Sequence, residues 1–112
     1  MYAFKSLAAL ALIAGLAQAS PAPEPIIKLV KMCDKPHLQG SCFDFQTEIE
    51  VCKNLTPNID NKLSSFDTGL TFCDFYKDKG CAGDNKTFRG KQEELPAEYN
   101  NKISSVKCRN WK

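Results

Sequence analysis

Two six-residue segments of this chain are rich in oxygen atoms that could bind a hard cation. They are Asp60-Asn61-Lys62-Leu63-Ser64-Ser65 and Asn100-Asn101-Lys102-Ile103-Ser104-Ser105. Carboxylate, carboxamide, hydroxyl and backbone carbonyl oxygens are the ligands that Ca²⁺ prefers. The same residue types are also common in turns, because short polar side chains bond to nearby backbone groups. By composition alone, each segment is either a calcium-binding loop or an ordinary turn.

The two segments lie forty residues apart, and the same shift aligns other residues of the chain. It places Cys33 on Cys73, Asp34 on Asp74 and Gly40 on Gly80, and with one gapped residue it also places Cys42 on Cys81. One shift therefore matches nine positions without a gap, six of them consecutive. The chain is predicted to contain two copies of one forty-residue unit.

Each copy has the composition of short β-strands rather than of helices. The β-branched or aromatic runs are 26–30, 42–45 and 70–76, with weaker runs at 85–89 and 103–108. Residues 91–95 have a helical composition, but Pro96 limits them to a turn. Four short strands per copy with a long connection predict a Greek key, and two keys facing each other predict a small β-sandwich. The fold class is therefore expected to be all-β.

The first nineteen residues have the features of a secretory signal peptide. Lys5 precedes an apolar run at 7–16, and Ala17-Gln18-Ala19 forms a small-residue cleavage site before Ser20. The apolar run is shorter than the ~20 residues of a membrane span. We therefore expect a secreted protein with no membrane span. Residues 20–28, which are proline-rich at their start, should be an exposed leader, and 29–112 the folded domain, with Greek keys at 29–69 and 70–112.

All six cysteines follow the expected cleavage site, which predicts three disulfides in an extracellular protein. A zinc site is disfavoured, since there is no CxxC pair and His37 is the only histidine. The repeat suggests equivalent links in each half. The candidate pairs are Cys33–Cys42, Cys73–Cys81 and Cys52–Cys108, with Cys73–Cys108 as an alternative.

The remaining composition gives little sign of catalysis or of nucleic-acid binding. Without Lys5, fourteen basic residues face thirteen acidic ones, and no basic stripe is interleaved with aromatic residues. His37 is the only histidine, and no serine or free thiol lies in a sequence context typical of a nucleophile. Glu93, Glu94 and Glu98 are expected to form a solvated face. We predict no catalytic residue, no nucleic-acid partner and a monomer.

Two N-glycosylation sequons are present, Asn54-Leu55-Thr56 and Asn85-Lys86-Thr87. Both asparagines are candidate glycan sites on exposed loops. Pro57 follows the first sequon and is expected to reduce its use, so Asn85 is the better candidate.

The two six-residue segments resemble the calcium-binding signature of the βγ-crystallin superfamily, N/D-N/D-x-x-S/T-S, which occurs once in each of two Greek keys. The resemblance extends over about residues 29–108 and is strongest toward the small secreted fungal members. It implies that the two loops exchange ligands to form two adjacent Ca²⁺ sites. The implied ligands are the hydroxyls of Ser64 and Ser104, the backbone carbonyls of Lys62 and Lys102, and oxygens of Asp60, Asn61, Asn100 and Asn101. Ser65 and Ser105 would be structural.

The chain departs from this family pattern at two places. Cys33 and Cys73 stand where the first aromatic residue of each key's corner is expected, so a disulfide would replace ring packing, and only Gly40 and Gly80 are kept. Asp60 is the one carboxylate among the four Asx positions. Because affinity follows ligand charge, we expect weak Ca²⁺ binding with a Kd of roughly 10⁻⁴ to 10⁻³ M.

The resemblance implies a secreted, non-enzymatic, calcium-binding protein. The alternative is a secreted toxin or effector, or a protease inhibitor, since a killer toxin and a metalloprotease inhibitor have this fold. A net charge near +1 argues against a membrane-active toxin. Fold alone does not decide between these functions.

Overall fold

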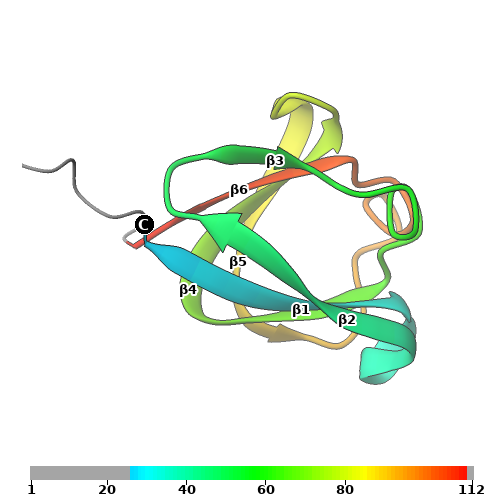
Figure 1. The fold of residues 1–112 in the computed structure, drawn as a ribbon. Coiled ribbons are helices and arrows are strands. Elements are labelled where there is room, and N and C mark those ends of the chain that lie inside the picture. The colour runs from blue at the N-terminus through cyan, green and yellow to red at the C-terminus, as the bar shows by residue number, and fades with distance from the viewer. Residues whose placement is uncertain (1–25, 111–112) are drawn as a thin grey trace, which may run out of the picture.

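A computed structural model describes residues 26–110, which form six β-strands and one short 3₁₀ turn (Figure 1). The elements are β1 (Ile27–Lys35), η3 (Pro36–Leu38), β2 (Gln39–Glu48), β3 (Cys52–Asn54), β4 (Ser65–Asp78), β5 (Ala82–Gln92) and β6 (Ser105–Arg109). Each run predicted as a strand lies within or overlaps one of them. The expected signal segment 1–19 and most of the leader lie outside the described residues. β1 begins at Ile27, so the last residues assigned to the leader are strand.

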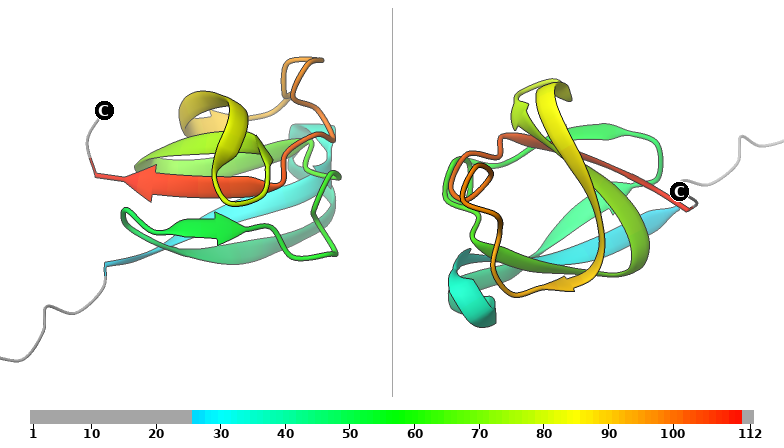
Figure 2. Two further views of the ribbon diagram at one scale, coloured as in Figure 1. Left: turned by 90° about the horizontal axis from the view of Figure 1, so that it is seen from above. Right: turned by 180° about the vertical axis from the view of Figure 1, so that it is seen from behind.

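The strands form one connected sheet that curls around a single core (Figure 2). Their order is β2-β1-β4-β6-β3, with β5 also paired to β4, and the strand pairs are antiparallel. The predicted all-β, disulfide-linked fold is confirmed. Within the described residues there are fewer and longer strands than the four per copy expected, because β4 and β5 each continue through a corner. No helix in this part of the chain has the length and apolar character that a membrane span requires.

β4 is shared by both halves of the molecule. Its first part pairs with β1, where Phe66 faces Met32, and its second part pairs with β6, where Phe75 faces Val106. Between them the strand turns at Gly69, whose φ is +67°. The Thr68 hydroxyl fixes this corner by donating to the Thr71 carbonyl at 2.7 Å and accepting from the Gly90 amide at 2.7 Å.

The two halves exchange strand segments, β3 from the first half and the end of β5 from the second. Lys53 of β3 pairs with Val106 of β6, and Gln92 at the end of β5 pairs with Phe66 of β4. Each half therefore completes its sheet with a segment of the other. Backbone hydrogen bonds in a sheet leave costly unpaired groups when a neighbouring strand is missing, so the two halves depend on each other.

The hairpins of the two halves correspond by a shift of forty-three residues, not forty. Cys33 faces Ser65 in β4, whereas the residue that faces Ser105 is Tyr76. Positive φ angles follow the same shift: His37, Leu38 and Gly40 in the first hairpin, and Gly80, Cys81 and Gly83 in the second. The alignments of Cys33 with Cys73, Asp34 with Asp74 and Gly40 with Gly80 are therefore wrong, as is the gapped match of Cys42 with Cys81.

An insertion in the first half explains this error. Gly40 lies thirteen residues before Lys53, whereas Gly83 lies nine residues before the corresponding Gln92. The added residues form a turn in which the Val51 amide donates to the Glu48 carbonyl at 3.1 Å and Glu50 has a φ of +66°. A single shift found in the sequence cannot represent both the hairpins and the six-residue segments.

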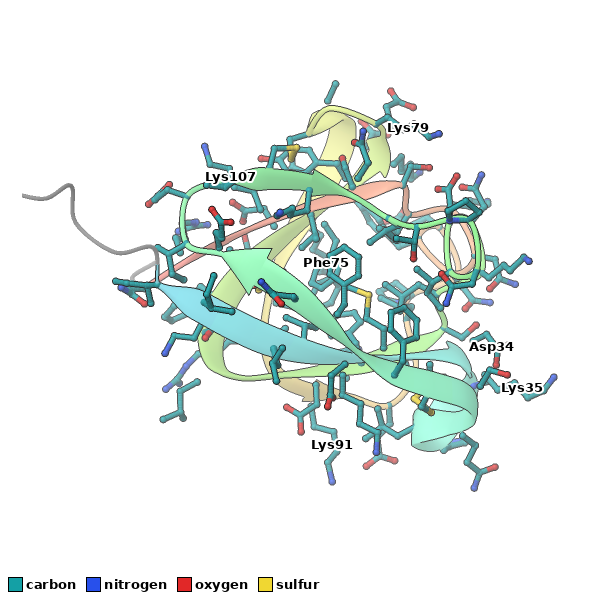
Figure 3. The ribbon with its side chains drawn as sticks, in the orientation of Figure 1. Asp34, Lys35, Phe75, Lys79, Lys91 and Lys107 are labelled. Carbon is teal, nitrogen blue, oxygen red and sulfur yellow. A yellow bond between two sulfur atoms is a disulfide. The ribbon has the colours of Figure 1, made fainter. Side chains whose placement is uncertain are left out.

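Gly40 and Gly83 are the glycines that each hairpin corner requires. A Cβ added at Gly40 would lie 2.3 Å from Asp34 Oδ1, and one at Gly83 would lie 2.3 Å from Asp78 Oδ2. Both glycines also have φ near +80°, where a side chain is disfavoured. At Gly80 an added Cβ meets no atom within 4 Å. In Figure 3, Asp34 and Lys79 mark the two hairpins at the periphery.

The disulfides are Cys33–Cys42, Cys52–Cys81 and Cys73–Cys108. The first and the alternative Cys73–Cys108 are confirmed, whereas Cys73–Cys81 and Cys52–Cys108 are wrong. Strand register decides the outcome: Cys33 faces Cys42, and Cys73 faces Cys108. The pairing by symmetry failed because Cys81 belongs to the hairpin tip and is not the counterpart of Cys42.

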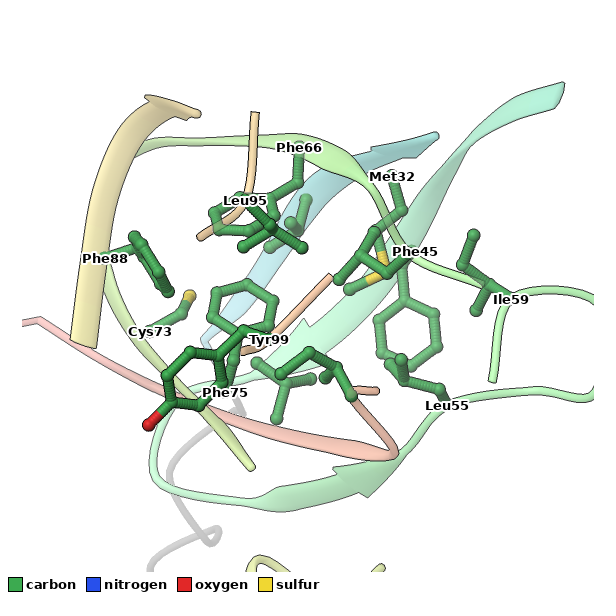
Figure 4. Close-up of a cluster of buried hydrophobic side chains, with 14 of the residues drawn as sticks. Met32, Phe45, Leu55, Ile59, Phe66, Cys73, Phe75, Phe88, Leu95 and Tyr99 are labelled. Carbon is green, nitrogen blue, oxygen red and sulfur yellow. The ribbon is translucent and has the colours of Figure 1, made fainter. Parts of the chain in front are cut away.

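Three phenylalanines form the centre of the core, from both parts of β4 and from β5 (Figure 4). The Phe66 and Phe75 rings are stacked with centroids 4.2 Å apart, and Phe88 meets both edge-on at 5.2 and 5.8 Å. Phe66 and Phe75 are fully buried. Aromatic pairs of this geometry contribute beyond their buried area, so the core joins the two halves.

A polar cluster lies on the outer face of β4, β5 and β6. Arg109 donates to both carboxylate oxygens of Asp74, at 2.8 and 3.1 Å, and the Thr87 hydroxyl also donates to Asp74. Burial opposes ionisation of Asp74, but the hydrogen bonds from Arg109 and Thr87 and the charges of Arg109 and Lys107 hold its pKa below the ordinary value. The cluster therefore ties three strands together through an ionised carboxylate.

Candidate functional site

Both six-residue segments form turns at one end of the molecule, each closed by the same backbone bonds. The Thr56 carbonyl accepts from the Ile59 and Asp60 amides, and the Pro96 carbonyl accepts from the Tyr99 and Asn100 amides, at 2.8–2.9 Å. Apolar side chains on both sides of each turn enter the core. They are Ile59 and Leu63 in the first, and Tyr99 and Ile103 in the second. Each polar segment is thus held between two buried anchors.

The backbones of the two turns bond to each other reciprocally. The Asn61 amide donates to the Ile103 carbonyl, and the Asn101 amide donates to the Leu63 carbonyl, both at 3.0 Å. Asn61 and Asn101 each have a φ of +60°. This left-handed conformation is tolerated by asparagine better than by most residues, which gives a structural reason for asparagine at the second position of each segment.

The side chains of the two segments cross between the halves. The Ser64 hydroxyl donates to Asn101 Oδ1 at 3.0 Å, and the Ser104 hydroxyl donates to Asn61 Oδ1 at 3.3 Å. We call Ser64 with Asn101 the first crossed pair, and Ser104 with Asn61 the second. Each crossed pair brings together one hydroxyl and one amide oxygen from residues 37 or 43 positions apart.

Asp60 carries the one carboxylate of the two segments, and one of its oxygens is without a partner. Asp60 Oδ1 is buried and makes no hydrogen bond to any described residue. A buried, unbonded carboxylate oxygen is costly, and a bound cation would satisfy it. The oxygen donors of these segments therefore fit a hard cation. In residues 26–110, the two segments included, no three His, Cys, Asp or Glu side chains are grouped to hold a metal ion.

The remaining sequence-derived site residues lie in the same two turns. Lys62 and Lys102 have exposed side chains, and their amides donate to the Ile59 and Tyr99 carbonyls. Asn100 is half-buried at the position that corresponds to Asp60. The structure thus gathers the eight residues implied as ligands in two hydrogen-bonded loops.

Ser65 and Ser105 each hold the hairpin of their own half. The Ser65 hydroxyl accepts from the Leu38 amide and donates to the Lys35 carbonyl. The Ser105 hydroxyl does the same with the Cys81 amide and the Asp78 carbonyl. The structural role expected for both serines is confirmed by these bonds.

Asn54 has a role at the second hairpin that the sequence did not indicate. Its Oδ1 accepts the Gly80 amide at 2.8 Å. The corresponding amide of the first hairpin, on His37, donates instead to the backbone carbonyl of Glu93 at 2.7 Å. A side-chain amide thus replaces a peptide carbonyl, and no local sequence signal marks this substitution.

The His37 and Glu93 side chains also meet, with Nδ1 3.3 Å from Oε1. Both side chains are more than half exposed, at 59% and 57%. A general acid-base pair is usually shielded from water and close to a nucleophile or a substrate cleft. This contact lacks such shielding.

No protein-family model matches the chain. No curated protein matches it either.

Solved structures do match the fold. One is a βγ-crystallin domain from Clostridium beijerinckii, 18% identical, which covers 75% of this chain and 100% of its own with a TM-score of 0.64. Another is a βγ-crystallin domain from Flavobacterium johnsoniae, 19% identical, covering 70% of this chain and 91% of its own with a TM-score of 0.58. The N-terminal domain of Protein S is 20% identical, covering 71% and 93% with a TM-score of 0.56. The chain therefore has the fold of a βγ-crystallin domain.

Proposed function

We propose that this chain is a secreted, non-enzymatic, weakly calcium-binding domain whose sites are formed by the two crossed pairs. The observation that carries the proposal is the reciprocal contact of Ser64 with Asn101 and of Ser104 with Asn61. Each contact places oxygen donors of the two halves side by side. The expected signal segment and the three disulfides support secretion.

Each proposed site takes a hydroxyl from one segment and an amide oxygen from the other, with the third-position carbonyls of Lys62 and Lys102 as further ligands. Asp60 and Asn100 supply the remaining oxygens. A bound Ca²⁺ would link the two turns by replacing the hydroxyl-to-amide hydrogen bonds with metal–oxygen bonds. With Asp60 as the one carboxylate of both segments, a Kd of roughly 10⁻⁴ to 10⁻³ M is expected.

One neighbouring structure is a nickel complex of a clostrillin double mutant in which two serines are replaced by histidines. That metal is bound by a variant with introduced histidines. It therefore supports neither calcium binding nor a particular ligand set in this chain.

Isothermal titration of the secreted protein with CaCl₂ tests the proposal, with MgCl₂ in parallel. The double variant Ser64→Ala, Ser104→Ala removes both donor hydroxyls and should abolish the binding heat. Ser41→Ala is the matched control, because Ser41 is exposed and bonds to Asp34 through its backbone amide. At tenfold the Kd, bound Ca²⁺ should stabilise the native state by about 1.4 kcal/mol.

Calcium binding would be rejected by the absence of both a binding heat and a rise in Tm at ~10 mM Ca²⁺. Equal binding by the wild type and by the double serine variant would instead reject the assignment to the crossed pairs.

A further inference from the structure

The two N-glycosylation sequons differ in what their asparagine side chains do in the fold. Asn54 ends β3, and Asn85 lies within β5. N-glycosylation joins the side-chain amide nitrogen to a large, hydrated oligosaccharide, so the folded protein must leave that nitrogen open to solvent. The surroundings of each carboxamide therefore separate the two candidates.

Asn54 is exposed as well, but its carboxamide oxygen takes part in a hydrogen bond of the fold. Its oxygen accepts the Gly80 amide at 2.8 Å, and the same strand and hairpin are joined by the Cys52–Cys81 disulfide. Because the carboxamide is planar, a sugar on its nitrogen would lie beside the bonded Gly80 peptide. The Leu55 side chain is buried in the core, and its amide donates to the Ser104 carbonyl at 2.9 Å. This sequon is therefore part of the hydrogen-bonded structure beside the two six-residue segments.

The Asn85 carboxamide faces solvent. Asn85 is exposed, and β5 pairs with β4 on one side only among the described strands. Asn85 is held in the fold through its backbone: it faces Tyr76 in the β4–β5 register, and its carbonyl accepts the Tyr99 hydroxyl at 3.0 Å. Strand alternation places its side chain on the outer face with Thr87 and Arg89. A sugar there leaves these backbone contacts in place.

We propose that the secreted protein carries one N-linked glycan, on Asn85, and that Asn54 stays unmodified. The inference rests on the secretion included in the proposed function. The donor would be a lipid-linked oligosaccharide diphosphate. The Asn85 amide nitrogen bonds to the anomeric carbon and loses a proton, while the anomeric carbon–oxygen bond breaks and the lipid diphosphate leaves.

Secretion of the full chain from a eukaryotic host tests the inference. Wild-type protein, Asn85→Gln and Asn54→Gln are compared by gel mobility before and after N-glycosidase treatment in H₂¹⁸O, with peptide mass spectrometry of both sequons. The wild type should carry one glycan, lost in Asn85→Gln and kept in Asn54→Gln. The mass map of the wild type needs no variant, so poor folding of a variant does not affect the result.

A parallel expression with the host's own signal peptide in place of residues 1–19 separates the two hypotheses. If the native chain stays in the cell while this version is secreted with a glycan on Asn85, the predicted signal fails and the glycan site stands. Secreted protein with a glycan on Asn54, or with none on Asn85, would overturn the inference.

Discussion

At the scale of single residues, the crossed pairs suggest how the proposed affinity for Ca²⁺ could be raised. Asn61 and Asn101 contribute amide oxygens, each already accepting a serine hydroxyl. An aspartate has the same shape and would still accept that hydroxyl, while adding a negative charge to a proposed calcium site. Asx residues also tolerate the left-handed conformation that both positions require.

We therefore expect Asn61→Asp and Asn101→Asp each to lower the Kd for Ca²⁺ by roughly tenfold, since affinity follows ligand charge. Isothermal titration measures the change. Asn58→Asp is the control, because it adds the same charge to the first turn on an exposed side chain outside the crossed pairs. An equal gain in Asn58→Asp would point to a general electrostatic effect.

Asp74 allows a prediction about pH. Its folded-state pKa is below the ordinary value, so its contribution to stability is complete above the unfolded pKa of about 3.9 and is lost as the pH falls through the folded pKa. Asp74→Asn should lower the free energy of unfolding by about 1–3 kcal/mol at pH 7, with a smaller difference from wild type at pH 2–3. Denaturant unfolding at both pH values measures this, and the exposed Asp84→Asn should show no comparable effect.

At the scale of elements, each hairpin is fixed by a corner glycine and a serine clamp. The clamps are equivalent, Ser65 with Leu38 and Ser105 with Cys81. The corner glycine of the second hairpin is Gly83, although the forty-residue repeat indicates Gly80. Both have positive φ, but they differ in the space around the missing side chain.

Gly83→Ala should therefore destabilise the protein more than Gly80→Ala. Both substitutions force alanine into a left-handed conformation at a cost of about 1–2 kcal/mol. At Gly83 the new methyl group would also lie 2.3 Å from Asp78 Oδ2 and 2.9 Å from its Cγ, so the Asp78 side chain must move, which adds a further cost that is absent at Gly80. Thermal unfolding of the two variants makes the comparison, and equal losses would contradict the corner assignment.

At the scale of the whole molecule, the exchanged strands make the domain one cooperative unit. β3 completes the sheet of the second half and the end of β5 completes that of the first. The phenylalanine cluster crosses between the halves as well, and so does the Cys52–Cys81 disulfide.

Neither half should fold alone. We expect 20–69 and 70–112, expressed separately, to give unfolded circular dichroism spectra and poorly dispersed NMR amide signals, because each lacks a paired strand and part of the core. The full chain should unfold in a single two-state transition in denaturant. A dispersed spectrum from either half would show that the exchanged strand is dispensable.

The sequence by itself determined the local features of this protein. Strand composition and the two oxygen-rich turns could be predicted because each depends on residues close together in the chain. The structural role of Ser65 and Ser105 came instead from the family resemblance, since their hydroxyls bond to residues 24–30 positions away. The positions of strands at Cys42, Phe72 and Val106 follow from β-branched and aromatic runs, which favour strands wherever they pack.

The tertiary structure decided what depends on register. Cys73 lies opposite Cys108 because β4 and β6 are neighbours, and Cys81 is bonded to Cys52 because the second hairpin folds back over β3. The first half has four more residues than the second between Gly40 and Lys53 and one fewer between Lys53 and Asp60, a net shift of three, so the repeat misaligned the hairpins while matching the six-residue segments. Likewise, the contact of each serine with the asparagine of the other half exists only after both turns have docked on one core.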